Sequence, residues 1–123
     1  MDTEIIFKKI LDSSFKVHSA LGPGLLESAY EECLYYELIS LGFKVEKQKP
    51  LPLIYNEIKL EAGYRVDLLV ENSIIVEIKS VDAMNNIHLA QILTYLKLSG
   101  CKLGLLVNFN TVHLKDGIKR VIL

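Results

Sequence analysis

The sequence predicts an α/β or α+β domain in which one sheet is flanked by helices. Three observations predict it. Apolar residues recur at helical spacing near the N-terminus, residues 43–80 form short alternating runs typical of strands, and a strongly apolar strand at 103–109 follows a further helical segment. The 123 residues suit one domain, so we expect residues 1–123 to form a single unit.

Glycine and proline residues mark where the predicted helices end. We expect helices over residues 4–20, over about 25–41, and from Asn85 or Asn86 to Ser99. The first helix stops at the turn formed by residues 22–24, Gly-Pro-Gly. The other two stop at Gly42 and Gly100.

Alternating segments between turn residues predict the strands. We expect strands at residues 43–49, 51–55, 58–62, 64–71, 74–80 and 103–109, and a terminal hairpin of 112–115 with 118–123. Asn56-Glu57 suits a hairpin turn, and Asn72-Ser73 suits a short turn. Gly63 suits a bulge before the strand that follows it.

The charge balance narrows the classes of protein. With 14 basic and 15 acidic residues the net charge is −1, which argues against a protein that coats nucleic acid by bulk charge. Two local basic clusters, at residues 44–49 and 115–120, remain as candidate contacts. For each cluster taken alone, solvated lysines at a strand edge are the favoured explanation.

Cysteine usage and apolar run length indicate the compartment. Cys33 and Cys101 lie far apart and form no metal-ligand spacing, so we expect buried thiols in a reducing environment. No apolar run reaches membrane-spanning length, and the N-terminus lacks the apolar stretch of a signal peptide. We therefore expect a cytoplasmic protein without a membrane partner.

The segment VEIKS, residues 76–80, carries charges in an otherwise apolar strand. Glu77 and Lys79 are two residues apart, so their side chains share a face. A Glu–Lys pair on a half-exposed face is one explanation. If the strand is buried, the charges need each other or a metal ion, because an unpaired buried charge costs several kcal/mol.

Asp67 interrupts the preceding apolar strand in the same way, against both strand propensity and burial. A two-residue turn between the strands would pair Asp67 with Ile78 and put the carboxylates on opposite faces. An odd-length loop or a bulge would pair it with Glu77 or Lys79. We predict the odd register, because it gathers the three charges into one site.

Two carboxylates at one point repel each other, and a divalent cation relieves that repulsion. Mg²⁺ or Mn²⁺ prefers oxygen ligands and takes one or two carboxylates together with water and substrate phosphate. Asp67 and Glu77 are the predicted ligands, and the backbone carbonyl of Ile78 is a further one. Lys79 would hold or deprotonate a water and offset phosphate charge, which outlines a site for phosphodiester hydrolysis.

Two helical segments carry side chains that fit such a site. Glu27 and Tyr30 are three residues apart on the second helix, and Gln91 and Tyr95 are four apart on the third, with His88 along the same face. Each set can also be the ordinary boundary of an amphipathic helix. Together with the strand charges, the glutamine and the second tyrosine are predicted to bind a phosphate or to orient the lysine.

These residues resemble the PD-(D/E)XK nuclease superfamily and, more narrowly, the small family named for its GxxExxY motif. GLLESAY at residues 24–30 fits that motif, and the segments YRVDLLVENSIIVEIKS, AQILTYLKLSG and LLVNFN resemble family segments. The resemblance covers about residues 5–122. The proline of the superfamily motif is missing, since Val66 precedes Asp67.

The resemblance implies a restriction-endonuclease-like fold: an α-β-β-β-α-β core with a mixed central sheet flanked by helices, an extra N-terminal helix and a C-terminal hairpin. The catalytic residues that it implies are the motif aspartate, the E-x-K pair, the first-helix acid and the Q-x-x-x-Y pair of RecB-like nucleases, namely Asp67, Glu77, Lys79, Glu27, Gln91 and Tyr95. In this scheme Glu27 takes a second metal ion or a bridging water.

Two functions are compatible with these patterns and a third is not. The first is a Mg²⁺- or Mn²⁺-dependent phosphodiesterase that acts on DNA, with RNA as the other candidate substrate, and works as a homodimer. The second is a catalytically inactive binding or regulatory module in a nucleic-acid-associated assembly, which the near-zero net charge favours. The third, a metal-free hydrolase, finds no support, because Ser13, Ser14 and His18 form no triad spacing with an acid.

Overall fold

The computed structural model describes residues 2–61 and 63–123. Over these residues the chain forms a mixed five-stranded sheet, a separate two-stranded sheet and three α-helices, which confirms the predicted α/β class. The helices are α1 (Thr3–Leu21), α2 (Glu27–Ser40) and α3 (Asn86–Ser99). The strands are β1 (Val45–Pro50), β2 (Leu53–Tyr55), β3 (Ile58–Leu60), β4 (Arg65–Val70), β5 (Ile74–Lys79), β6 (Leu103–Asn108) and β7 (Ile118–Ile122), the last preceded by a 3₁₀-helix, η1 (Leu114–Gly117).

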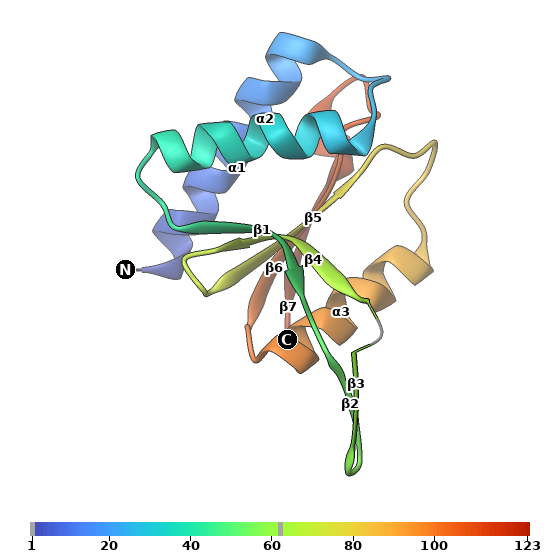
Figure 1. Cartoon of the computed structure of the whole chain (residues 1–123). Helices are drawn as coiled ribbons and strands as arrows, with labels where there is room; N and C mark the ends of the chain where they lie inside the picture. Colours follow the sequence, from blue (N-terminus) through green and yellow to red (C-terminus); the bar gives the residue numbers. More distant parts are fainter. Residues whose placement is uncertain (1, 62) are drawn as a thin grey trace.

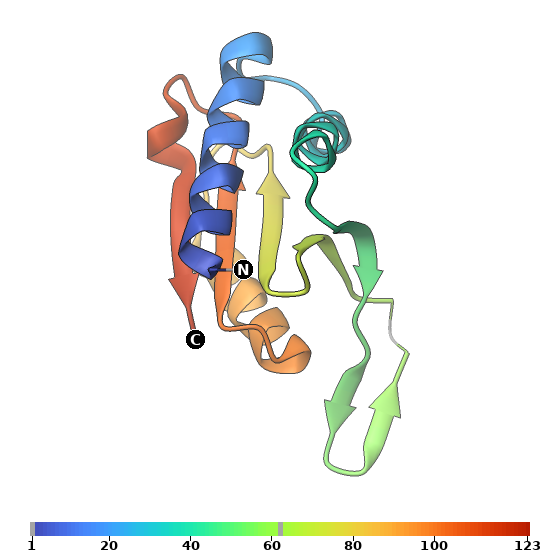
Figure 2. The ribbon, with the colours of Figure 1, turned by 90° about the vertical axis from the view of Figure 1, so that its left-hand side faces the viewer.

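The five-stranded sheet has the strand order β1-β4-β5-β6-β7. β5 and β6 are parallel and are joined through α3, whereas the other neighbouring strands are antiparallel. A parallel pair needs a crossover of this kind, and the crossover helix covers one face of the sheet. α1 and α2 lie on the other face, so the sheet is the middle of three layers (Figure 1, Figure 2).

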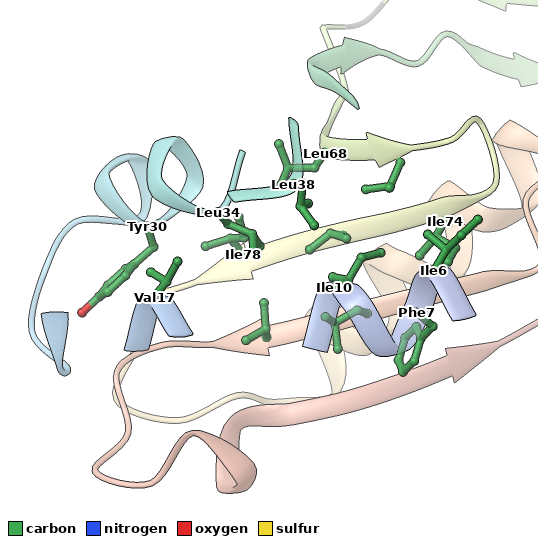
Figure 3. Close-up of a cluster of buried hydrophobic side chains, with 14 of the residues drawn as sticks. Ile6, Phe7, Ile10, Val17, Tyr30, Leu34, Leu38, Leu68, Ile74 and Ile78 are labelled. Atoms are coloured by element: carbon green, nitrogen blue, oxygen red, sulfur yellow. The ribbon is translucent and has the colours of Figure 1, made fainter. Parts of the chain in front are cut away.

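Two apolar cores, one on each face of the sheet, hold the layers together. Ile74, Val76 and Ile78 of β5 belong to the core under α1 and α2 (Figure 3), while Ile75 packs with Ile92 of α3. Because successive side chains of a strand point to opposite faces, β5 must be apolar on both sides to lie between two helical layers. The strand is thus fixed from both sides, and its charged residues lie at its end.

Side-chain caps explain where α1 and α3 begin. Asp2 accepts a hydrogen bond from the backbone N–H of Glu4 at the start of α1. Asn85, one of the two predicted caps of α3, accepts from the N–H groups of Ile87 and His88, and His88 Nδ1 accepts from the Asn85 N–H at 3.3 Å. His88 therefore belongs to the helix cap. Within the described residues no helix is long and apolar enough to cross a membrane.

The C-terminal segment differs from the prediction. The expected strand at residues 112–115 is wrong, because these residues form a bend and the start of η1. β7 pairs antiparallel with β6 instead, so this pair replaces the predicted terminal hairpin. Gly117 permits the tight path, because a Cβ there would lie 2.2 Å from the carbonyl oxygen of Asn108.

The β2–β3 hairpin projects away from the main sheet (Figure 2). It turns at Asn56, with φ 52°, where the hairpin turn was predicted. Gly63, expected in a bulge, lies instead in the loop that leads into β4, with φ 83°. Ala62, which ends the predicted strand 58–62, lies outside the described residues.

Candidate active site

The turn between β4 and β5 sets the register of the charged residues. It has three residues, of which Glu71 and Asn72 adopt the left-handed conformation with φ 51° and 54°. The residue pairs that follow it are Val70 with Ile74, Leu69 with Ile75 and Leu68 with Val76. Continued by one step, this register places Asp67 opposite Glu77. The predicted odd register is therefore confirmed.

At Asp67 and Glu77 the backbone-to-backbone hydrogen bonds between β4 and β5 end. Hydrogen bonds from backbone N–H groups to side-chain carboxylates take their place. Glu77 Oε2 accepts from the backbone N–H of Asp67 at 2.8 Å, and Asp67 Oδ2 accepts from the backbone N–H of Ile78 at 2.8 Å. Each carboxylate is thus fixed by the opposite strand through one oxygen. Its second oxygen is left for another partner, which for Asp67 Oδ1 is the Gln48 amide at 3.2 Å.

Burial changes the acidity of both carboxyl groups. Glu77 is only 3% exposed, and burial together with the neighbouring Asp67 charge raises its pKa to about 8. Burial also raises the pKa of Asp67, and the hydrogen bond from the Ile78 N–H opposes that rise. The two groups cannot both ionise at neutral pH without cost, and a bound cation removes that cost.

Lys79 is held beside the carboxylates by α3. Its Nζ donates to Gln91 Oε1 at 3.3 Å. The ammonium lies close enough to Asp67 and Glu77 to lower the pKa of both. Tyr95, one helical turn after Gln91, is buried, and burial followed by the Glu77 charge raises the pKa of its phenol. α3 thus brings the glutamine and the tyrosine to the strand charges.

Glu27 begins α2 and reaches the end of β5. Its Oε2 accepts from the backbone N–H of Ser80 at 3.2 Å, and Ser80 Oγ donates to the carbonyl of Leu25 at 2.6 Å. These bonds tie the residues at the start of α2 to the segment that follows Lys79. The Glu27 charge is near enough to Asp67 to raise its pKa, so Glu27 lies at the edge of the same site.

Tyr30, predicted on the same helix face as Glu27, has a structural position instead. It is fully buried, and its ring stacks on Phe109 with 4.5 Å between centroids. Its hydroxyl donates to the carbonyl of Gly22 at 2.6 Å and accepts from the N–H of Leu25 at 3.1 Å. The tyrosine therefore holds the turn that leads into Glu27 and does not face the charged site.

A pocket of about 400 Å³ opens beside Asp67. Its lining residues are Glu27, Ser28, Glu31, Gln48, Asp67 and Ile78. Ser28, Glu31 and Gln48 are the three that the sequence did not single out, and Glu31 and Gln48 are the two of these that hydrogen-bond at the site. Gln48 Nε2 donates to Glu31 Oε1 at 2.6 Å and to Asp67 Oδ1 at 3.2 Å. Burial raises the pKa of Glu31, and the Asp67 charge raises it further.

The donor chemistry of the site fits a hard divalent cation. Asp67 and Glu77 supply carboxylate oxygens. The Lys79 carbonyl accepts from Phe109 on the β6 side, so the preceding carbonyl, that of Ile78, points toward the β4 side, since strand carbonyls alternate in direction. Across residues 2–61 and 63–123 no three His, Cys, Asp or Glu side chains are placed to enclose a metal ion. The site suits an ion that keeps several waters, as Mg²⁺ does.

The fold and the paired carboxylates define an α/β domain with a candidate hydrolytic centre. The model of the PD-(D/E)XK nuclease superfamily matches residues 4–121, and the chain belongs to this superfamily. Membership indicates nuclease activity in general, a nucleic-acid substrate, and the divalent metal ions that these nucleases generally use. Comparisons with curated proteins and with solved structures gave no match. The narrower GxxExxY resemblance and the roles of the individual site residues stay predictions.

Proposed function

We propose that the protein hydrolyses phosphodiester bonds of DNA with the help of Mg²⁺ or Mn²⁺. The observation that carries the proposal is the meeting of the Asp67 and Glu77 carboxylates at the end of β4 and β5, with the Lys79 ammonium beside them. Membership of the nuclease superfamily supports a nucleic-acid substrate. The choice of DNA over RNA belongs to the proposal and is tested with it.

Each residue at the centre has a distinct task in the proposed reaction. Asp67, Glu77 and the Ile78 carbonyl would hold the ion, which when bound supplies an activated water and offsets phosphate charge. Lys79 orients the water and stabilises the negative charge that develops on the phosphate oxygens. Gln91 keeps the ammonium in place through the 3.3 Å hydrogen bond.

Glu27 and Tyr95 act at the margin of the proposed centre. Glu27, whose carboxylate accepts from the Ser80 N–H, would take a bridging water or a second ion. Burial raises the pKa of the Tyr95 phenol, so it stays protonated at neutral pH and can donate a hydrogen bond to the scissile phosphate. The pocket of about 400 Å³ beside Asp67 offers room for the phosphate backbone.

A substrate panel tests the proposal. Purified protein is incubated with single-stranded DNA, double-stranded DNA and RNA, in Mg²⁺, Mn²⁺ or EDTA. We expect metal-dependent cleavage of DNA, which Glu77→Ala and Lys79→Ala each reduce by roughly 10²-fold or more. Asp12→Ala, which removes an exposed carboxylate of α1, is the matched control and should cleave like the wild type. Cleavage that survives Glu77→Ala comes from a contaminant or another site and ends the assignment.

A catalytically inactive binding or regulatory module is the second candidate. The net charge of −1 favours it, as does the acidic lining beside Asp67, where Glu27 and Glu31 repel a phosphate backbone unless a cation is bound. Titration calorimetry with Mn²⁺, with and without DNA, separates the two candidates. The absence of binding at millimolar Mn²⁺ would favour the module.

We also propose that the protein is a homodimer in the cytoplasm. An apolar hollow of about 330 Å³ between α1 and α2, lined in part by Val17, Cys33 and the exposed Tyr36, supports a two-fold contact on this face. Sedimentation equilibrium measures the assembly. The mass of one chain, 13.9 kDa, at every concentration would contradict the dimer. Cell fractionation tests the location.

A further inference from the structure

A smaller pocket adjoins the candidate site. It measures about 170 Å³ and is lined by residues of the base of the β2–β3 hairpin and of α3. Its lining residues are Leu53, Tyr64, Gln91, Thr94, Tyr95 and Leu98. Gln91 links the two sites, because it lines this pocket and also accepts the hydrogen bond from Lys79. A group bound here would be one side chain away from the lysine of the proposed reaction.

The lining of this pocket combines aromatic, apolar and uncharged polar side chains. Tyr64 is 45% exposed, so part of it faces solvent, whereas Tyr95 is 6% exposed and lies deeper in the lining. The two ring centroids are 6.5 Å apart, with 56° between the planes. Leu53 and Leu98 add apolar surface, and Thr94 adds a hydroxyl. In the described part of the chain, no residue that lines this pocket is charged. The pocket therefore suits a flat base rather than a phosphate.

A backbone hydrogen bond at the base of the hairpin holds Tyr64 in place. The backbone N–H of Leu51 donates to the carbonyl of Tyr64 at 2.8 Å, which joins the two chain segments that enter and leave the hairpin. The backbone of Tyr64 is therefore fixed before any ligand arrives. An aromatic ring on a fixed backbone loses little freedom on stacking, and this favours binding.

We propose that this pocket receives a nucleobase that has left the helical stack beside the scissile phosphate. The substrate class is then nucleic acid whose bases are free to unstack: single strands, flaps and frayed ends. The proposal rests on the proposed nuclease function, which puts a phosphate at Lys79. A base within an intact duplex must first be unpaired and unstacked, so an intact duplex binds more weakly.

The test measures binding, so that it does not depend on cleavage. Fluorescence anisotropy compares a short labelled single strand of DNA with the matching blunt duplex in Ca²⁺, with the DNA checked on a gel for integrity. The wild type should bind the single strand more tightly. Tyr64→Ala should lower the single-strand affinity about ten-fold, the change that follows from loss of about 1.4 kcal/mol of base–aromatic stacking.

Three further variants define the effect. Tyr64→Phe keeps the ring and should bind like the wild type. Tyr55→Ala removes an exposed ring from the same hairpin but outside the pocket, and should also bind like the wild type. Thr94→Leu narrows the pocket from the α3 side and leaves the Tyr64 ring in place. It should weaken single-strand binding as Tyr64→Ala does. If circular dichroism shows that Tyr64→Ala is unfolded, Thr94→Leu replaces it in the test.

Two results would overturn the proposal: equal wild-type affinity for single strand and duplex, or equal losses from Tyr64→Ala and Tyr55→Ala. Failure of the proposed function looks different. A wild type that binds single strands through Tyr64 but never cleaves leaves the base pocket and removes the nuclease assignment. The opposite result is metal-dependent cleavage by a protein whose single-strand binding does not change in Tyr64→Ala or Thr94→Leu. That result keeps the nuclease assignment and removes the base pocket.

Discussion

The two halves of the β4–β5 pair have opposite chemistry. Next to the turn, buried apolar side chains pair across the strands: Val70 with Ile74, Leu69 with Ile75 and Leu68 with Val76. At the far end Asp67 and Glu77 stand opposite each other, and their carboxylates accept backbone N–H groups beyond the ladder. The apolar half buries its surface and so stabilises the register that the three-residue turn sets. The polar half uses that register to hold two charges together.

The halves also differ in what they contribute to folding. In the described part of the chain no buried side-chain nitrogen or oxygen lacks a hydrogen-bond partner, so the polar half is satisfied in that respect. Its remaining cost is electrostatic, because burial and the Asp67 charge raise the pKa of Glu77 to about 8. The apolar half therefore stabilises a site whose buried carboxylates oppose folding when they are ionised, a cost that is common at functional centres.

Truncation of the apolar half should have the largest effect on stability. Ile74 is fully buried, and Ile74→Ala should lower the free energy of unfolding by about 2–5 kcal/mol, from lost burial and the cavity left behind. Urea denaturation followed by circular dichroism measures the change. Ile54→Ala, at an exposed position of β2, is the matched control and should change it by less than about 0.5 kcal/mol. Similar small losses at both positions would mean that the apolar half does not hold the pair.

Removal of the charge from the polar half should raise stability when no metal is present. The Glu77 carboxyl ionises near 4.5 in the unfolded chain and near 8 in the folded one, so the folded protein keeps a proton that the unfolded chain releases between these values. Wild-type stability therefore falls as the pH rises through this window. Glu77→Gln avoids the loss and should exceed the wild type by a few kcal/mol above pH 8, with little difference below pH 4.5. Thermal denaturation in EDTA over this range measures it.

Adding a metal ion extends the comparison of the wild type with Glu77→Gln. Added Mg²⁺ should stabilise the wild type, because an ion that binds only the folded state adds its binding free energy, and should leave Glu77→Gln nearly unchanged. Asp12→Asn, an exposed carboxylate on α1, serves as the control and should follow the wild type at every pH. A Glu77→Gln variant less stable than the wild type at high pH would show that the carboxylate contributes more as a hydrogen-bond acceptor than its burial costs.

Loss of the support that α2 gives to the site should lower the free energy of unfolding by a smaller amount. Tyr30→Phe leaves the Gly22 carbonyl and the Leu25 N–H without their hydroxyl partner, and should lower the free energy of unfolding by about 1–3 kcal/mol. Cleavage should also fall, because the turn that leads into Glu27 loosens. Tyr36→Phe, an exposed tyrosine of α2, is the control. Equal stability of the two variants would mean that solvent replaces the hydroxyl at the turn.

Local sequence patterns predicted much of the β4–β5 pair. They failed where the structure depends on packing between segments that are distant in the sequence. The meeting of Asp67 and Glu77 could be predicted because a strand has a two-residue period and a short turn limits the register. At residues 112–115 the same alternation misled, since the close approach of Gly117 to the Asn108 carbonyl favours a 3₁₀-turn there. Alternation alone cannot show which segment a strand will meet.

Glu31 and Gln48 were missed for the same reason. Gln48 stands opposite Asp67 only because β1 pairs with β4 across an intervening hairpin. Glu31 reaches it only because α2 packs over that edge of the sheet. The one local clue was the spacing of Glu31, four residues after Glu27 and so on the same helix face.

Of the positions discussed here, replacement of Gln48 should change the free energy of unfolding least. It should nevertheless clearly reduce cleavage. It adopts φ 50°, a left-handed conformation that costs a residue with a Cβ about 1–2 kcal/mol. Gln48→Gly removes that cost along with the hydrogen bonds to Glu31 and Asp67, so the two changes offset and the free energy of unfolding should move by less than about 1 kcal/mol.

Gln48→Ala loses the same bonds but keeps the left-handed backbone, so it should be less stable than Gln48→Gly by about 0.5–1 kcal/mol in urea denaturation. Both variants should lose cleavage to the same extent, because the amide that donates to Asp67 Oδ1 is gone. If Gln48→Gly cleaves as well as the wild type, the left-handed residue only bends β1 at the point where β4 and β5 part. If both variants lose activity equally despite their different stabilities, activity depends on the Gln48 amide that donates to Asp67 and not on the strain of the backbone that carries it.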